Sequence, residues 1–200
     1  MTYVRMLYGS RARGDQDGLS DTDHLVIDDE PGADYSWDDI LRLRSYGSLF
    51  LWHLALEGVV LDSDEDGADR WTRLSTSLPA YGRVDDDIES FQTVLTDVQH
   101  ALTARDTDVL FEASVLARTV RHAAILGCHV TGDPNFSRYG AVEKALIRLQ
   151  IQRPAGATFE SLYDAVLRPD DFALDASAVD SWVTVGFELT DRIRQEGVAA

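Results

Sequence analysis

The sequence predicts an α+β protein, with a small sheet and a flanking helix followed by a C-terminal helical bundle. Two observations support this fold class. Short apolar runs bounded by turn-forming residues fill the first part of the chain, and apolar residues at helical spacing fill the rest. The segment 79–87 begins with Pro79 and reads as a linker. We therefore expect one domain over residues 1–78 and a second over residues 85–200.

The first domain is expected to hold three strands and one interrupted helix. Each expected strand is an apolar run that ends at a turn-forming residue, and the runs cover residues 4–8, 25–27 and 59–61. Apolar spacing over 38–57 predicts a helix that is broken near Gly47. The acidic run 62–67 predicts a solvated turn.

The second domain is expected to be helical throughout. Its apolar residues recur every three or four positions, which places them on one face of a helix. Asp87 is expected to cap the first helix. The expected helices cover residues 88–104, 107–128, 138–149, 159–167 and 178–196.

Composition narrows the classes of function. The formal net charge is −17, and no basic patch offsets it, which argues against a protein that binds nucleic acid. The single cysteine, Cys128, excludes an intrachain disulfide framework and suits a reducing cytosol. No segment is apolar enough to span a membrane, and the first residues do not resemble a signal peptide. We therefore expect a cytoplasmic protein without membrane contact.

The most specific signal is a glycine-serine turn after the first expected strand. Gly9 can adopt backbone angles closed to other residues and lets a ligand approach closely. Ser10 offers a hydroxyl and an N–H to a phosphate oxygen. Arg11 and Arg13 follow, and guanidinium groups match phosphate oxygens well. We therefore expect these four residues to bind the phosphates of a nucleotide.

Two carboxylates, Asp21 and Asp23, precede the second apolar run. Side chains two residues apart in a strand point to the same face, so the two carboxylates can converge. Like charges so close are unfavourable unless a cation lies between them, and Mg²⁺ prefers carboxylates plus substrate phosphates. Alone, such a pair is more often a solvated loop. Because it follows the glycine-serine turn, we favour a Mg²⁺ site.

Together these motifs resemble the nucleotidyltransferase superfamily that includes DNA polymerase beta. Gly-Ser-x-Ala-Arg-Gly followed by Ser-Asp-x-Asp is typical of its small bacterial members, the minimal and the aminoglycoside nucleotidyltransferases. The resemblance covers about residues 4–28, and a weaker similarity runs from Tyr46 to Gly58. In this family a helix usually precedes the first strand, and we expect the domain over residues 1–78 to lack it.

The resemblance implies a Mg²⁺-dependent transferase. Gly9 and Ser10 would bind the triphosphate of an NTP, with ATP the expected nucleotide, and Asp21 and Asp23 would hold one or two Mg²⁺ ions. A hydroxyl of a small molecule, such as an aminoglycoside, or of a protein would attack the α-phosphorus and release pyrophosphate. The acidic composition favours a cationic acceptor.

The family also places a third carboxylate beside the first two, as a base toward the acceptor hydroxyl. Asp34, which precedes a Ser-Trp pair as in relatives, is one candidate, and Asp62, which ends the third apolar run, is the other. An ordinary surface or capping aspartate is the alternative for each. Without a third carboxylate, the chain would bind a nucleotide or a partner protein, for example in a toxin–antitoxin pair, with little catalysis. A second copy of the chain, in a homodimer, is a further expected partner.

Overall fold

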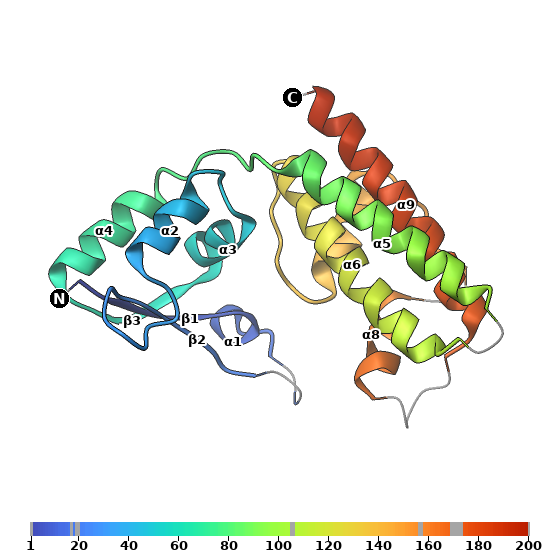
Figure 1. The fold of residues 1–200 in the computed structure, drawn as a ribbon, viewed down its shortest axis with the longest axis horizontal. Coiled ribbons are helices and arrows are strands. Elements are labelled where there is room, and N and C mark those ends of the chain that lie inside the picture. The colour runs from blue at the N-terminus through green and yellow to red at the C-terminus, as the bar shows by residue number, and fades with distance from the viewer. Residues whose placement is uncertain are drawn as a thin grey trace. The chain divides into compact units, whose positions relative to one another are not determined.

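The computed structural model describes residues 2–16, 18, 21–104, 107–155, 158–168 and 174–199. The chain divides into two compact units, Met1–Arg83 and Val84–Ala200. The first unit carries a small antiparallel sheet with helices, and the described part of the second unit is helical (Figure 1). The predicted α+β class, with a small sheet followed by a helical bundle, is therefore confirmed.

Three antiparallel strands form the sheet of the first unit, in the order β2-β1-β3. They are β1 (Val4–Tyr8), β2 (Asp23–Ile27) and β3 (Val59–Ser63). Tyr8 pairs with Asp23 where β1 ends and β2 begins. Asp62 pairs with Arg5 near the other end of β1, beyond a register shift in the β1–β3 ladder. The sheet register therefore sends Asp23 and Asp62 toward opposite ends of the central strand.

Three helices pack on one face of this sheet, α2 (Trp37–Arg44), α3 (Leu49–Glu57) and α4 (Glu65–Ser75) (Figure 1). A fourth, α1 (Ser10–Arg13), is a single turn directly after β1. Alternate side chains of β1 and β2 meet apolar side chains of the helices, as the period of a half-buried strand requires. The buried core consists of Val4, Met6, Leu25, Ile27, Trp37, Ile40, Leu51, Leu54, Trp71 and Leu74.

The turn predicted for residues 62–67 is wrong, because Asp62 and Ser63 end β3 and the chain enters α4 at Glu65. Asp64 is the N-cap of α4, and its carboxylate accepts a hydrogen bond of 2.8 Å from the N–H of Gly67. Glu65 and Asp66 occupy the first turn of the helix, where the helix dipole favours negative charge. The second half of the acidic run therefore begins a helix.

The predicted linker over 79–87 is shorter in the structure, because α5 already begins at Val84. The three aspartates at 85–87 lie in its first turn, where carboxylates interact favourably with the unpaired N–H groups. Asp87 is therefore inside the helix and does not cap it.

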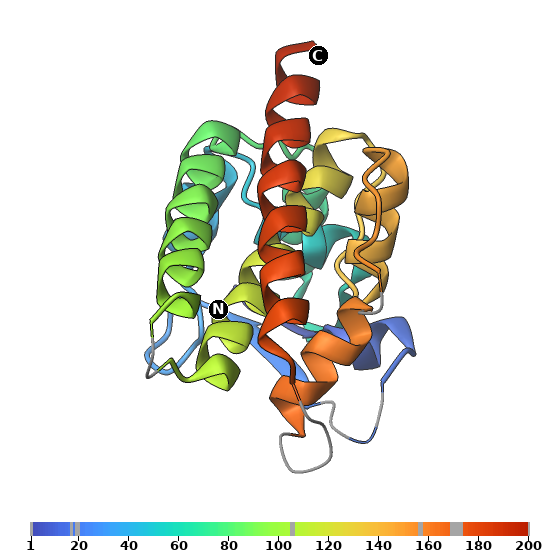
Figure 2. The same cartoon turned by 90° about the vertical axis from the view of Figure 1, so that its right-hand side faces the viewer.

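The second unit is built around α6 (Val109–Val130), which contacts the other helices of the bundle (Figure 2). These are α5 (Val84–Leu102), α7 (Gly140–Arg148), α8 (Phe159–Leu167) and α9 (Ala176–Ala199). Small buried residues such as Ala113, Ala123 and Ala124 let the neighbouring helices approach α6 closely. Within the described ranges, no helix has both the length and the apolar character needed to cross a bilayer.

Two histidines of α6 should make the stability of this unit depend on pH. Burial lowers the pKa of His122, with help from Arg121 and Arg118 and against the effect of Asp87. Burial also lowers the pKa of His129. Unfolded chains bind protons to histidine near the ordinary value of 6.5, so the unfolded state takes up more protons as the pH falls below that value.

We therefore expect the free energy of unfolding to be fully retained above about pH 6.5 and to decrease as the pH falls toward the lowered folded pKa values. Urea denaturation at several pH values between 7.5 and 5.5 measures this decrease. The decrease should be smaller in a variant carrying His122→Gln and His129→Gln. A decrease of the same size in both proteins would contradict the assignment.

Candidate functional site

The glycine-serine turn has a backbone that only glycine adopts readily. Gly9 has φ 74° and ψ −156°, a combination that strains any residue with a side chain. A Cβ atom added to Gly9 would lie 2.4 Å from Oδ2 of Asp23. The carboxylate of Asp23 thus lies directly against the backbone of the turn, and two of the residues predicted from sequence meet here.

Asp23 belongs to the face of the sheet that the helices cover. Its partner Tyr8 follows Met6 by two positions on β1, so the Tyr8–Asp23 pair lies on the same face as the buried Met6–Leu25 pair. The side chain of Asp23 is only half-buried at this end of the sheet. Asp23 is therefore held in place by the strand register and remains partly exposed.

Asp23 and Asp34 both influence the Tyr8 phenol. Burial raises the pKa of the Tyr8 phenol, and the nearby Asp23, Tyr35 and Asp34 raise it further. The Tyr8 ring also packs edge-on against Phe50, with ring centroids 5.9 Å apart. Asp23 and Asp34 therefore act on the same phenol, one from β2 and one from the segment that leads to α2.

Ser10, Arg11 and Asp21 lie around the same turn. Ser10 is half-buried and begins α1, where the first N–H groups of a helix have no acceptor within the helix. Arg11 and Asp21 are exposed, and Asp21 lies just before β2. Ser20, which belongs to the predicted Ser-Asp-x-Asp motif, lies outside the described residues.

Arg13, also predicted to bind phosphate, points toward carboxylates. Its Nη1 donates to Oε2 of Glu57 at 2.8 Å, and its Nε donates to Oδ2 of Asp15 at 3.1 Å. His53 joins this group, since its Nε2 lies 3.1 Å from the same oxygen of Glu57. Sequence patterns gave no sign of this cluster, because Glu57 and Arg13 are distant in the chain and belong to different elements.

The two candidates for a third carboxylate have different positions. Oδ2 of Asp34 accepts a hydrogen bond of 2.8 Å from the N–H of Val26 in β2. Asp62 pairs with Arg5 in the β1–β3 ladder. A side-chain hydrogen bond between Tyr3 and Asp62 raises the pKa of the Tyr3 phenol. The three residues from Arg5 to Tyr8 correspond to about 10 Å of strand. Val26 also pairs with Arg5, so Asp34 and Asp62 both lie about this far along the sheet from Asp23. They differ in side: Asp34 lies beside β2 and raises the pKa of the Tyr8 phenol, whereas Asp62 lies on β3, across β1 from β2.

A metal site with three protein ligands is not formed by these side chains. Among the residues that the structure describes, no group of three or more His, Cys, Asp or Glu side chains is placed to hold a metal ion. Mg²⁺ often takes one or two carboxylates and completes its shell with water and substrate phosphates. Asp21 and Asp23 are the two carboxylates that the sequence predicts for such an arrangement. Of these, Asp23 lies against the turn, whereas Asp21 is exposed just before β2.

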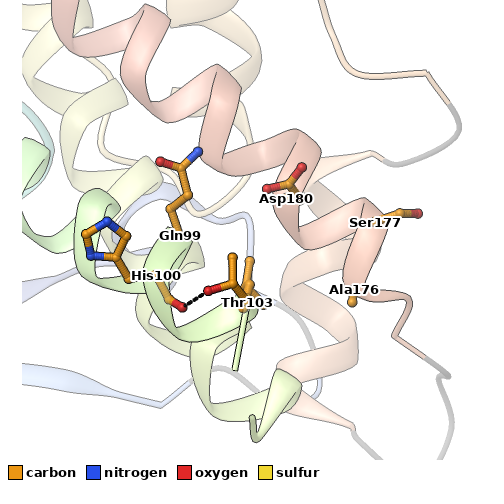
Figure 3. Close-up of a pocket in the computed structure, with 7 residues that line it drawn as sticks. Gln99, His100, Thr103, Ala176, Ser177 and Asp180 are labelled. Atoms are coloured by element: carbon orange, nitrogen blue, oxygen red, sulfur yellow. Dashed lines mark hydrogen bonds between the residues drawn. The ribbon is translucent and has the colours of Figure 1, made fainter. Parts of the chain in front are cut away.

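The second unit has an open hollow of about 590 Å³ between the end of α5 and the start of α9 (Figure 3). The hydroxyl of Thr103 donates to the carbonyl oxygen of His100 at 2.7 Å on its α5 side, and Asp180 projects from α9. Sequence analysis did not single out this hollow, because its polar residues come from two distant helices without a local motif. Its lining is Gln99, His100, Leu102, Thr103, Ala176, Ser177 and Asp180.

Comparison with known proteins adds no assignment. A scan against models of protein families finds no match, and a search of curated proteins finds no relative. The functional interpretation therefore depends on the geometry of the turn and its carboxylates.

Replacing Gly9 by alanine should disturb the turn more than the same change at Gly14. Both glycines have positive φ, 74° and 77°, but a Cβ at Gly14 would meet no atom within 4 Å. We expect Gly14→Ala to cost about 1–2 kcal/mol from backbone strain alone. Gly9→Ala should cost more, roughly 3 kcal/mol, or displace Asp23.

Urea denaturation gives the two losses of stability, and the amide shifts of β2 report a displaced Asp23. Equal losses for the two variants, with unchanged shifts in β2, would show that Asp23 does not press against Gly9.

Proposed function

We propose that the chain is a Mg²⁺-dependent nucleotidyltransferase. It would move a nucleoside monophosphate from an NTP, with ATP the expected nucleotide, to a hydroxyl of a small molecule such as an aminoglycoside, or of a protein. One observation supports this more than any other, the contact between the Asp23 carboxylate and the Gly9 backbone. It brings together the turn that would bind phosphate and a carboxylate that would bind the metal, and the transfer of a phosphoryl group requires such a pair.

Each residue at the turn would have a separate task. Gly9, having no side chain, lets the Asp23 carboxylate approach the backbone of the turn, and Ser10 would donate from its N–H and hydroxyl to phosphate oxygens. The exposed Arg11 adds a positive charge beside them. Asp21 and Asp23 would hold Mg²⁺, which neutralises charge on the phosphates and orients the reacting α-phosphorus.

The charge of the protein makes the metal necessary for binding. The chain carries a net charge of −17, and a triphosphate brought to Asp21 and Asp23 would be repelled by their carboxylates. A divalent cation between the carboxylates and the phosphates removes this repulsion. The same negative charge favours a cationic acceptor and disfavours nucleic acid.

Asp34 is our choice for the base that accepts the proton of the acceptor hydroxyl. It lies beside β2 and, like Asp23, raises the pKa of the Tyr8 phenol, whereas Asp62 lies on β3, on the other side of β1. One carboxylate oxygen of Asp34 accepts from the N–H of Val26, which fixes its orientation and leaves the second oxygen for a substrate. We place this enzyme in the cytoplasm, where ATP and Mg²⁺ are available, without membrane contact.

A second candidate is a nucleotide-binding protein with little catalytic activity, acting alone, as a homodimer or with a partner protein. The hydrogen bond between Asp34 and the backbone of Val26 favours this alternative, because it gives Asp34 a structural role that needs no substrate. Retained nucleotide binding without release of pyrophosphate for any acceptor would distinguish it from the transferase.

Binding of ATP should require Mg²⁺ and both carboxylates of the pair. Calorimetry of the full chain should detect MgATP, and Asp21→Asn combined with Asp23→Asn should weaken it by about 100-fold or more, since two charged metal ligands are lost. Asp62→Asn is the matched control and should bind like wild type. Wild-type affinity in the double variant, or no binding of any MgNTP by wild type, would refute the proposed site.

Loss of Asp34 should separate catalysis from binding. With a panel of aminoglycosides as acceptors, Asp34→Asn should slow pyrophosphate release by 10²-fold or more while MgATP affinity stays within about threefold. The change preserves the amide oxygen that can accept from Val26, so the fold should be kept. If pyrophosphate release is slowed by Asp62→Asn and not by Asp34→Asn, our assignment of the base is wrong.

A further inference from the structure

The single-turn helix α1 has no apolar anchor of its own. It spans Ser10–Arg13, and none of its residues is buried. A helix of one turn is unstable by itself, because forming the first turn fixes several residues for a single hydrogen bond. Other contacts must therefore hold α1 in place, and with it Ser10 of the Gly9-Ser10 turn.

An ion pair connects α1 with α3. Arg13 and Glu57 are 2.8 Å apart, and their side chains are only 16% and 17% exposed, so solvent and salt screen the pair weakly. The same oxygen of Glu57 lies 3.1 Å from Nε2 of His53. Burial acts to raise the pKa of Glu57, but hydrogen bonds from His53 and Arg13 outweigh it and lower that pKa. Glu57 therefore remains charged in the folded protein.

The other carboxylate at Arg13 cannot hold α1 in the same way. Asp15 follows Arg13 by two residues, and its side chain is 45% exposed, so this pair connects α1 only with its own continuation. Glu57 belongs to α3, which Leu51 and Leu54 fix in the core. Of these two contacts, only the one with Glu57 transmits the rigidity of the core to α1.

We propose that Glu57 is a positioning residue, which acts through Arg13 to hold α1 and the Gly9-Ser10 turn against Asp23. Arg13 then serves chiefly to fix the turn, because two carboxylates already balance its charge. The effect on nucleotide binding rests on the proposed function. The effect on α1 does not depend on it.

The test compares Glu57→Ala with Asp15→Ala in the full chain. Both changes remove one carboxylate from Arg13, but only the first removes the ion pair between α1 and α3, leaving the longer contact of 3.5 Å between Arg13 and His53. Hydrogen exchange of a peptide covering residues 9–15 should be about tenfold faster or more in Glu57→Ala, and nearly unchanged in Asp15→Ala. MgATP affinity should fall by about tenfold in Glu57→Ala only. Glu57→Gln, which keeps an oxygen acceptor for Arg13, should recover part of both effects.

A double-mutant cycle shows whether Glu57 acts through Arg13. Adding Glu57→Ala to Arg13→Ala should change neither exchange nor affinity further, whereas two independent roles would give additive losses. Additive losses would overturn the proposal. If Glu57→Ala does not fold, Glu57→Gln and Arg13→Lys supply the comparison, because each keeps a polar partner in place.

The outcomes also separate this proposal from the proposed function. Unchanged exchange of residues 9–15 in Glu57→Ala would overturn the positioning role, whatever the protein binds. Faster exchange, in a protein whose wild type binds no MgATP, would establish the positioning role and refute the proposed function. Faster exchange with wild-type affinity for MgATP would refute the claim that the position of the turn governs phosphate binding.

Discussion

The first unit depends on one close approach, that of the Asp23 carboxylate to the backbone of Gly9. The approach is possible because Gly9 has no side chain, where a Cβ would be 2.4 Å from the carboxylate oxygen. It also requires that β2 begin directly beside the end of β1, as the Tyr8–Asp23 pairing provides. Helix α1 begins directly after Gly9 and contains Ser10 and Arg11, which are expected to bind phosphate.

The apolar core fixes the register of β1 and β2, and this register brings Asp23 to Gly9. Met6 and Leu25 pair across the strands and point into the core beneath the helices. A slip of one residue would turn these side chains to the other face and remove them from the core. Because burying each such side chain is worth about 1.5–3 kcal/mol, the core selects the pairing that also puts Asp23 against Gly9. Packing far from the turn thus sets its geometry.

The elements with strong local signals could be predicted from the sequence, and those that depend on distant partners could not. Apolar runs and helical spacing indicated the strands and the helical second unit. The single turn of α1 is too short to show a helical period. Helix α4 was not predicted because its start is acidic and contains Gly67, as a solvated turn does, and its buried apolar side chains, Trp71 and Leu74, come late in the helix. The pairing of Arg13 with Glu57 joins different elements, so no local pattern reveals it. Likewise, only strand order and register show that Asp62 lies away from the turn.

The most direct test of a metal and phosphate site at the turn uses Mn²⁺, which accepts the oxygen ligands of Mg²⁺ and broadens nearby nuclear magnetic resonance signals. Substoichiometric Mn²⁺ is added to the full chain with ATP, and amide signals are followed along the first unit. The account predicts strongest broadening at Gly9, Ser10 and Asp23, with the signals of residues 62–66 little affected. Strongest broadening at residues 62–66, or none at the turn, would contradict it.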